Sequence, residues 1–153
     1  MTLISPEVGK QIKQALSVMD APVRLVVFTR TDATHEECEY CAETQQLVEE
    51  IAALEDKIRF EIHDLSTQDP ASNEAAKAYQ VDKVPAIAVI RDTTPPIDYG
   101  IRLYGIPAGY EFSAFIEAIL MVSREQHGLT EKTLSQLEHL DRPVHIQVYT
   151  TPT

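Results

Sequence analysis

The only two cysteines of this chain lie three residues apart, in the stretch Cys38-Glu39-Tyr40-Cys41. Apolar residues follow at helical spacing, so the cysteines stand at the start of a predicted helix that ends near Glu55. Unpaired backbone N–H groups and the positive end of the helix dipole lower the pKa of a thiol at such a position below its free value of about 8.5. Two thiols with this spacing can close a small disulfide and reopen it, so the stretch predicts redox chemistry.

Two other interpretations of the cysteine pair remain open. Structural zinc takes four ligands, and the chain has no second cysteine pair, although His35 is close enough in sequence to be a third ligand. The thiols can also be inert.

His63 could serve as a base for a thiol, but a histidine in the middle of a strand is more often a half-exposed neutral residue. The spacing rules favour redox chemistry, and the sequence predicts no metal and no other cofactor.

The composition limits the classes of partner. A length of 153 residues with 44% hydrophobic content predicts one compact domain. A formal net charge of −11 argues against a surface for nucleic acid or anionic membranes. No run approaches the ~18 apolar residues of a membrane span, and residues 1–10 lack the apolar region of a signal peptide. We therefore expect a cytoplasmic protein, in which an isolated Cys-x-x-Cys is more often catalytic than structural.

Hydrophobic patterns and capping residues predict the other elements. Ser5, Pro6 and Glu7 have the character of an N-cap, a first-turn proline and a first-turn acid, and helical periodicity continues to about Asp20. Residues 23–29 form a nearly continuous apolar run, typical of a strand covered on both faces. Further along, the patterns predict a strand at 58–65, a short helix at 69–79, a strand that begins at Pro85, a short strand at 101–104 and a helix from about 111.

The predicted order is β-α-β-α-β-β-α with a helix in front, and the cysteines follow the first strand. This order resembles the thioredoxin-like fold, an α/β fold in which helices flank a central mixed sheet of about four strands. Five motifs narrow the resemblance: LIS at 3–5, CEYC at 38–41, VDKVPA at 81–86, YGIPAGYEF at 104–112 and VSRE at 122–125. They resemble the N-terminal unit of the glutaredoxin-like protein disulfide oxidoreductases of thermophilic archaea and bacteria, and the similarity covers essentially the whole chain.

The resemblance implies an enzyme that exchanges disulfides with protein substrates, with a thioredoxin-reductase-like flavoprotein as a further partner. Because Cys38 is nearer the solvent and the helix end, we expect it to attack a substrate disulfide as a thiolate, and Cys41 to resolve the mixed disulfide. By resemblance, Pro85 is a cis-proline that faces the cysteines, so a substrate chain can pair with the backbone of Val84. Tyr40 is either an aromatic lid between the thiols or an exposed tyrosine packed on the loop.

An internal repeat indicates a second unit. Residues 20–29 (DAPVRLVVFT) align with residues 141–150 (DRPVHIQVYT) at a constant offset of 121. We therefore expect a thioredoxin-like unit with the cysteine pair at 1–128, and the first helix and strand of a second, truncated unit at 129–153. Members of the family that the chain resembles continue from there into a second cysteine pair. The apolar face of the predicted strand at 144–148 then lacks a cover, so we expect the chain to self-associate or to fold this segment back on its own first unit.

Two features depart from the pattern of that family. The loop at 30–37 is several residues longer, and the acidic residues Glu37 and Glu39 flank Cys38. A carboxylate ~4 Å away costs a thiolate about 1 kcal/mol even in water, so these residues oppose the helix dipole. The main alternative to an active oxidoreductase is therefore a redox-weak half of a two-unit protein, which serves as a docking scaffold for the other unit.

Overall fold

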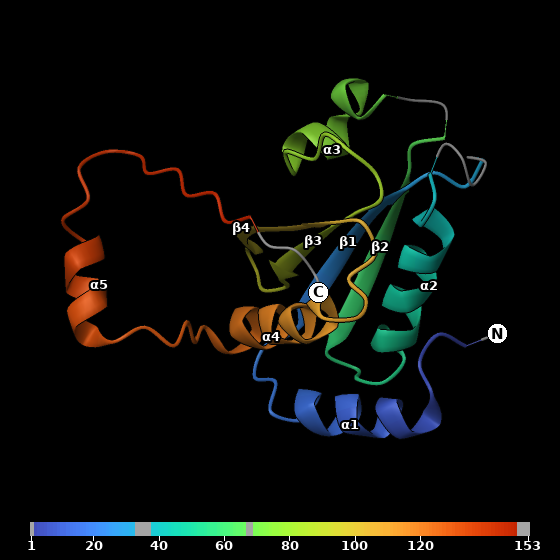
Figure 1. Ribbon diagram of the computed structural model, residues 1–153, viewed down its shortest axis with the longest axis horizontal. Coiled ribbons are helices and arrows are strands. Elements are labelled where there is room, and N and C mark those ends of the chain that lie inside the picture. Colours follow the sequence, from blue (N-terminus) through green and yellow to red (C-terminus); the bar gives the residue numbers. More distant parts are fainter. Residues whose placement is uncertain (1, 33–37, 67–68, 150–153) are drawn as a thin grey trace.

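The computed structural model describes residues 2–32, 38–66 and 69–149 of the chain (Figure 1). The elements follow in the order α1 (Pro6–Leu16), β1 (Val23–Thr29), α2 (Cys41–Ala52), β2 (Ile58–Asp64), the 3-10 helix η1 (Pro70–Ser72), α3 (Glu74–Ala78), β3 (Ala86–Arg91), β4 (Ile97–Tyr104), α4 (Glu111–Arg124) and α5 (Glu131–Leu137). The predicted order, with a helix in front of a β-α-β-α-β-β-α unit, is confirmed for the described residues.

The strands form one mixed sheet in the order β2-β1-β3-β4. β1 lies parallel to β2 and antiparallel to β3, and β4 is antiparallel to β3. All residues of β1 except Arg24 are buried, which explains the almost continuous apolar sequence of this interior strand. The parallel pairing brings the carboxyl ends of β1 and β2 to the same edge of the sheet, where Thr29 lies opposite Asp64.

Helices cover the two faces of the sheet unequally. On one face, α1, α2 and α4 enclose the larger core, around Leu16, Ile51 and Phe115 (Figure 1). On the other face, α3 contributes to a smaller core around Phe28 and Ala76. Full burial of a large apolar side chain contributes about 1.5–3 kcal/mol. The larger core therefore fixes α2, which carries the second cysteine, against β1.

Side-chain caps set four of the helix starts, and the cap at Ser5 was predicted from the sequence. The Ser5 hydroxyl accepts a hydrogen bond from the first turn of α1 (3.3 Å). The predicted short helix at 69–79 is divided into η1, capped by the Asp69 side chain, and α3, capped by the Asn73 side chain. The second cap begins a new helix a few residues after the first, which is why one predicted helix becomes two.

The predicted end of α1 and the predicted start of β4 are wrong. α1 ends at Leu16 instead of near Asp20, because the Ser17 hydroxyl donates to the Gln14 carbonyl oxygen (2.7 Å) and the chain leaves the helix there. β4 begins at Ile97, before its predicted start, and its first four residues are exposed. A strand that begins on the surface leaves no apolar run in the sequence to mark its start.

The C-terminal segment forms the predicted helix but not the predicted strand. α5 follows Thr130, whose hydroxyl accepts a hydrogen bond from the Thr133 N–H (3.3 Å). It stands away from the sheet in Figure 1. Residues 138–149 form no helix or strand and are exposed. A strand is stabilised by backbone hydrogen bonds to a neighbouring strand, and within the described ranges this segment joins no sheet. Because residues 138–149 are exposed, this described part of the segment does not pack on the first unit.

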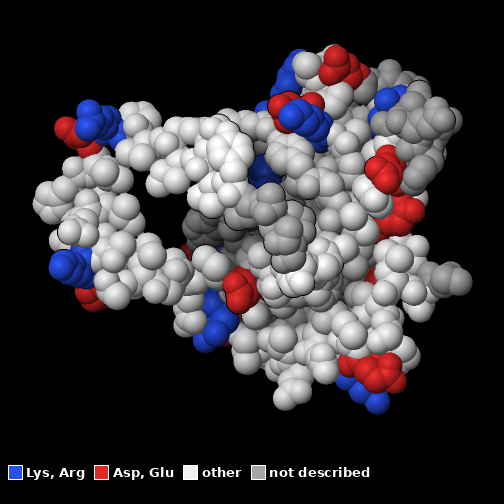
Figure 2. Space-filling model, viewed as in Figure 1, with Lys and Arg blue, Asp and Glu red and all other residues white. Residues whose placement is uncertain are grey.

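Charges are dispersed over the face of the molecule that Figure 2 shows. Figure 2 shows acidic and basic side chains scattered over one face of the molecule rather than gathered in a single patch. Some are paired, as in the contact between Arg24 and Glu61 (3.2 Å). In the part of the chain that the structure describes, no helix is long and apolar enough to cross a membrane.

Candidate active site

Cys38 and Cys41 form a disulfide, with 5.5 Å between their Cα atoms. α2 begins at Cys41, so the helix starts later than predicted and Cys38 lies in the turn before it. Tyr40 is the N-cap residue but makes no side-chain cap hydrogen bond, and no Ser, Thr, Asp or Asn between the cysteines marks the helix start. Cys38 is half-buried, whereas only 2% of Cys41 is exposed. The first cysteine is therefore accessible and the second is enclosed.

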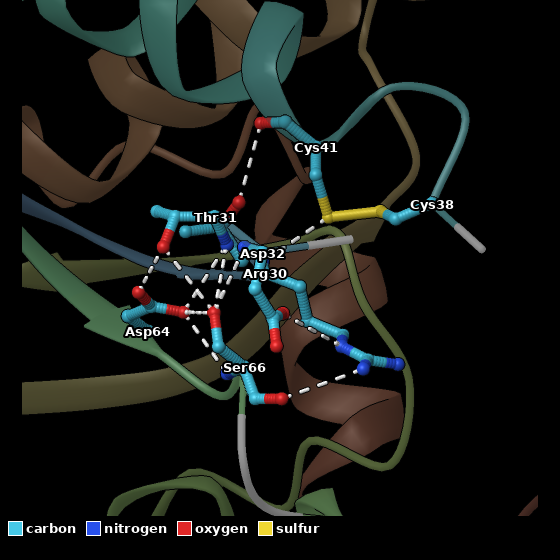
Figure 3. The surroundings of a disulfide bond; sticks show 8 residues. Arg30, Thr31, Asp32, Cys38, Cys41, Asp64 and Ser66 are labelled. Atoms are coloured by element: carbon cyan, nitrogen blue, oxygen red, sulfur yellow. Dashed lines mark hydrogen bonds and ion pairs between the residues drawn. A yellow bond between two sulfur atoms is a disulfide. The ribbon is translucent and has the colours of Figure 1, made fainter. Parts of the chain in front are cut away.

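Cys41 is held by the carboxyl end of β1. The Arg30 N–H donates a hydrogen bond to Cys41 Sγ (3.3 Å) (Figure 3). The Thr29 hydroxyl donates to the Cys41 carbonyl oxygen (3.3 Å). Thr29 is 1% exposed, so its hydroxyl must find a partner inside the protein. The end of β1 thus supplies two donors to the first residue of α2, and these fix the buried cysteine relative to the sheet.

A carboxylate at the end of β2 organises the segment that follows β1. Asp64 Oδ1 accepts hydrogen bonds from the N–H groups of Thr31 (3.2 Å) and Ser66 (3.0 Å), and the hydroxyls of both residues also donate to this carboxylate. These bonds, that of the Ser66 hydroxyl first, lower the pKa of Asp64 from 3.8 to about 2. The Arg30 guanidinium donates to the Ser66 carbonyl oxygen (3.4 Å) and lies 3.7 Å from Asp32. Figure 3 shows this cluster beside the disulfide.

A groove of about 490 Å³ opens beside the disulfide. The end of β1, the turn before α2 and the first part of α2 line it, with Thr29, Arg30, Thr31, Cys38, Glu39, Cys41, Ala42, Glu43, Gln45, Gln46 and Glu49. Both cysteines therefore face a space that a segment of another molecule can enter.

Tyr40 is 42% exposed and is not among the residues that line this groove. A hydrogen bond to Glu39 and the negative charge of that residue raise the pKa of the Tyr40 hydroxyl. This placement favours the exposed tyrosine over the lid between the thiols. Glu37, the other acidic residue that flanks Cys38 in sequence, lies outside the described residues.

The peptide bond between Val84 and Pro85 is cis, as the resemblance implied. Ala86 pairs with Phe28 in the sheet, so Pro85 lies at the edge where Thr29 ends β1. Val84 and Pro85 therefore stand at the same end of the sheet as the residues that hold Cys41. Neither of them lines the groove beside the disulfide.

The histidines and acidic residues of the described ranges form no cluster of three or more metal-ligating side chains with each other or with the cysteines. His63 stacks on Phe28, with 5.1 Å between ring centroids, and its Nε2 lies 2.8 Å from a Glu61 carboxylate oxygen. Its contacts are thus with the sheet rather than with a thiol. His35, the third zinc ligand considered above, lies outside the described residues.

Sequence reasoning missed Thr29, Arg30, Asp64 and Ser66. Two of them could have been found from their position, because Thr29 and Asp64 end neighbouring parallel strands. In α/β proteins, polar groups for ligands lie at the carboxyl ends of such strands. Arg30 contributes its backbone N–H, which every residue except proline has, so the residue type gives no signal. Ser66 acts through contacts between two loops, for which spacing gives no signal.

The profile of a family described as a domain of unknown function, DUF7088, matches residues 8–95, more than half of the chain. The chain belongs to this family. The matched range includes the cysteine pair and Pro85, so the candidate site lies inside the part that defines the family.

Curated relatives match almost the whole of this chain but are much longer. A protein named NADH dehydrogenase from Ferdinandcohnia aciditolerans is 25% identical over 147 residues, which is 96% of this chain and 24% of the relative. An alkyl hydroperoxide reductase protein of Escherichia coli is 25% identical over 148 residues, again 96% of this chain and 24% of the relative. The chain thus spans about a quarter of the length of these relatives.

Two solved structures share the fold. The NTD_N/C domain of the alkyl hydroperoxide reductase AhpF from Enterococcus faecalis has a TM-score of 0.71 at 22% identity, over 88% of this chain and 59% of the solved chain. A protein disulfide oxidoreductase from Aeropyrum pernix has a TM-score of 0.71 at 23% identity, over 89% of this chain and 55% of the solved chain. The chain therefore has the predicted thioredoxin-like fold, and its resemblance to protein disulfide oxidoreductases is confirmed at the level of the fold.

Proposed function

We propose that this chain is a thiol-disulfide oxidoreductase that exchanges disulfides with protein substrates through Cys38 and Cys41. The observation that carries the proposal is the disulfide, which joins a half-buried cysteine in a turn to a buried cysteine at the first residue of α2. The similarity to a protein named as part of an alkyl hydroperoxide reductase, and the fold shared with a protein disulfide oxidoreductase, support the same class of chemistry.

In the reducing direction, the Cys38 thiolate attacks one sulfur of a substrate disulfide, forms a mixed disulfide and releases one substrate thiolate. The Cys41 thiolate then attacks Cys38 Sγ, which restores the Cys38–Cys41 bond and releases the second substrate thiolate. Oxidation of a substrate dithiol is the reverse sequence. The difference in burial supports these roles, because a protein substrate reaches a half-buried Cys38 more readily than a Cys41 that is 2% exposed.

Two surfaces can hold the substrate chain next to Cys38. An extended segment can pair with the backbone of Val84, beside Pro85, like an added strand. Residues that flank the substrate cysteine can occupy the groove beside the disulfide. Tyr40, exposed at the N-cap of α2, offers a further apolar contact at the rim of the site.

The proposal extends to partners and domain organisation. A thioredoxin-reductase-like flavoprotein is the proposed electron donor, which fits a relative named NADH dehydrogenase, and the cytoplasm is the proposed compartment. Residues 1–128 are the proposed redox unit, and residues 129–153 are the proposed start of a second unit, with α5 as its first helix. α5 supports this division because it lies where the repeat places the helix.

The alternative is a docking half with little redox activity of its own. The apolar side chains of Val144, Ile146 and Val148 are 59%, 79% and 80% exposed. An apolar face of this kind favours contact with another protein unit. In that case the chain serves as a platform and its cysteines contribute little to turnover.

Reduction of insulin by dithiothreitol separates the two functions. An active oxidoreductase should shorten the lag before the reduced insulin precipitates, and Cys38→Ser should remove the effect, because no other cysteine is equally accessible. Cys41→Ser is a matched control that keeps the accessible thiol but cannot complete the cycle. A wild-type chain that is no faster than Cys38→Ser would reject the oxidoreductase and leave the docking half.

A further inference from the structure

Exchange at Cys38 places a negative charge on the buried sulfur of Cys41. When a substrate thiolate attacks Cys38 Sγ, a new S–S bond forms there, the Cys38–Cys41 bond breaks, and its electron pair leaves with Cys41 Sγ. Only 2% of Cys41 is exposed, so solvent gives this thiolate little stabilisation. Burial alone would raise the pKa of the thiol and make it a poor leaving group.

One hydrogen-bond donor already points at this sulfur. The Arg30 N–H donates to Cys41 Sγ, with 3.3 Å between nitrogen and sulfur. A hydrogen bond strengthens when its acceptor becomes charged, so the contact gains energy as the thiolate forms. The nearby Thr29 hydroxyl donates to the Cys41 carbonyl oxygen, which leaves the Arg30 N–H as the donor to the sulfur among the described residues.

The backbone around the Arg30 N–H is held from the end of β2. The Leu65 N–H donates to the Thr29 carbonyl oxygen of the same peptide group (2.8 Å), and an anchor that consists of Asp64 and Ser66 holds the residues that follow. Thr31, the next residue, donates its N–H both to Asp64 Oδ1 (3.2 Å) and to Ser66 Oγ (3.0 Å). The Asp32 N–H also donates to Ser66 Oγ (3.1 Å). Figure 3 shows these contacts converging on the segment that carries the Arg30 N–H. The backbone next to the disulfide is therefore tied to the end of β2.

We propose that Asp64 and Ser66 are positioning residues for disulfide exchange, which hold the Arg30 N–H at Cys41 Sγ and so stabilise the leaving thiolate. The inference rests on the exchange reaction proposed above. Both residues act through the backbone of Arg30 and Thr31 rather than on the sulfur. If they were only structural, loosening them would change the stability of the chain but not the acidity of Cys41.

Removal of the Asp64 side chain has two opposite effects on the pKa of Cys41. A nearby carboxylate disfavours a thiolate, so removal of the Asp64 charge alone would lower the pKa of Cys41. Loss of the positioned N–H would raise it. Ser66→Ala loosens the same anchor with no change of charge. Glu61→Gln is the matched control, because Glu61 is on the same strand and pairs with Arg24 (3.2 Å) rather than with the anchor.

The test measures acidity and exchange separately. The pKa of Cys41 is measured by ultraviolet absorbance of the thiolate in a Cys38→Ser background, and exchange is measured as the rate at which glutathione reduces the oxidised chain. We expect Ser66→Ala to raise the Cys41 pKa by about half to one unit, as one hydrogen bond to a charged atom weakens. Reduction by glutathione should slow about two- to threefold, because a thiol of higher pKa leaves more slowly. Asp64→Ala should act in the same direction, and Glu61→Gln should change neither quantity.

An unchanged or lower Cys41 pKa in Ser66→Ala would overturn the inference, even if the variant is active. Slower exchange with an unchanged pKa would overturn it as well, since the anchor would then be structural only. If the wild-type chain does not react with glutathione, the proposed function fails, but the pKa comparison still decides the inference. Far-ultraviolet circular dichroism confirms the fold of each variant, and Ser66→Ala carries the test if Asp64→Ala does not fold.

Discussion

Reduction of the Cys38–Cys41 bond should cost the fold little stability. The disulfide closes a loop of four residues, since its cysteines are three apart in sequence. In the chain-entropy description, so short a loop restricts the unfolded chain by only about 6 cal/mol/K, which corresponds to about 2 kcal/mol at 25 °C. A pair that opens and closes during turnover must leave the protein folded in both states. A disulfide that contributes only about 2 kcal/mol to the stability of the fold meets this requirement.

Urea unfolding of three samples measures this difference: the oxidised chain, the chain reduced with dithiothreitol, and the double variant Cys38→Ser/Cys41→Ser. The oxidised chain should be more stable than the reduced chain by about 2 kcal/mol, and the double variant should match the reduced chain. By linkage, the same energy separates the reduction potential of the pair in the folded and unfolded chain by about 40 mV. A loss of more than about 4 kcal/mol, or a reduced chain that does not fold, would refute this reasoning and mark the disulfide as structural.

Glu39→Gln should lower the pKa of Tyr40 toward 10.0 and that of Cys38 by a few tenths to about one unit, as followed by ultraviolet titration, and a Tyr40 pKa that does not move would contradict this. The lowered pKa of Asp64 means that its hydrogen bonds stabilise the fold above pH 3.8 and are lost as the pH falls through about 2. The difference in unfolding free energy between wild type and Asp64→Asn should shrink over that interval, and a constant difference would show the assignment to be wrong. Light scattering should give a larger mass for the full chain than for a chain that ends at Leu140, because the exposed tail is expected to self-associate, whereas two monomers of equal stability would reject this.

Burial decides how much of the fold the sequence predicts. β1 was predicted at 23–29 and forms Val23–Thr29, because an interior strand must be apolar along its whole length. Pro85, the predicted first residue of the third strand, stands immediately before β3, since a residue without an N–H cannot donate within the ladder. The strand predicted at 144–148 is absent. Alternation describes the two faces of a strand but does not supply the neighbouring strand with which it pairs.

The site was predictable only in part, for a related reason. Spacing alone identified Cys38 and Cys41, since two thiols three residues apart are a local feature. The anchor at Asp64 depends instead on contact with Thr31, 33 residues away, and this contact exists only once β1 and β2 pair in parallel. The donor to Cys41 Sγ is the backbone N–H of Arg30, which any residue except proline provides.

The central claim is that Cys38 exchanges disulfides and Cys41 resolves them, and trapping with single Cys→Ser variants tests it most directly. Each variant is mixed with a peptide disulfide and analysed by mass spectrometry without reductant. Cys41→Ser should accumulate a stable mixed disulfide on Cys38, because the resolving thiol is missing, whereas Cys38→Ser should accumulate little on a Cys41 that is 2% exposed. An adduct of equal stability on Cys41 in Cys38→Ser, or no adduct in Cys41→Ser, would contradict the account.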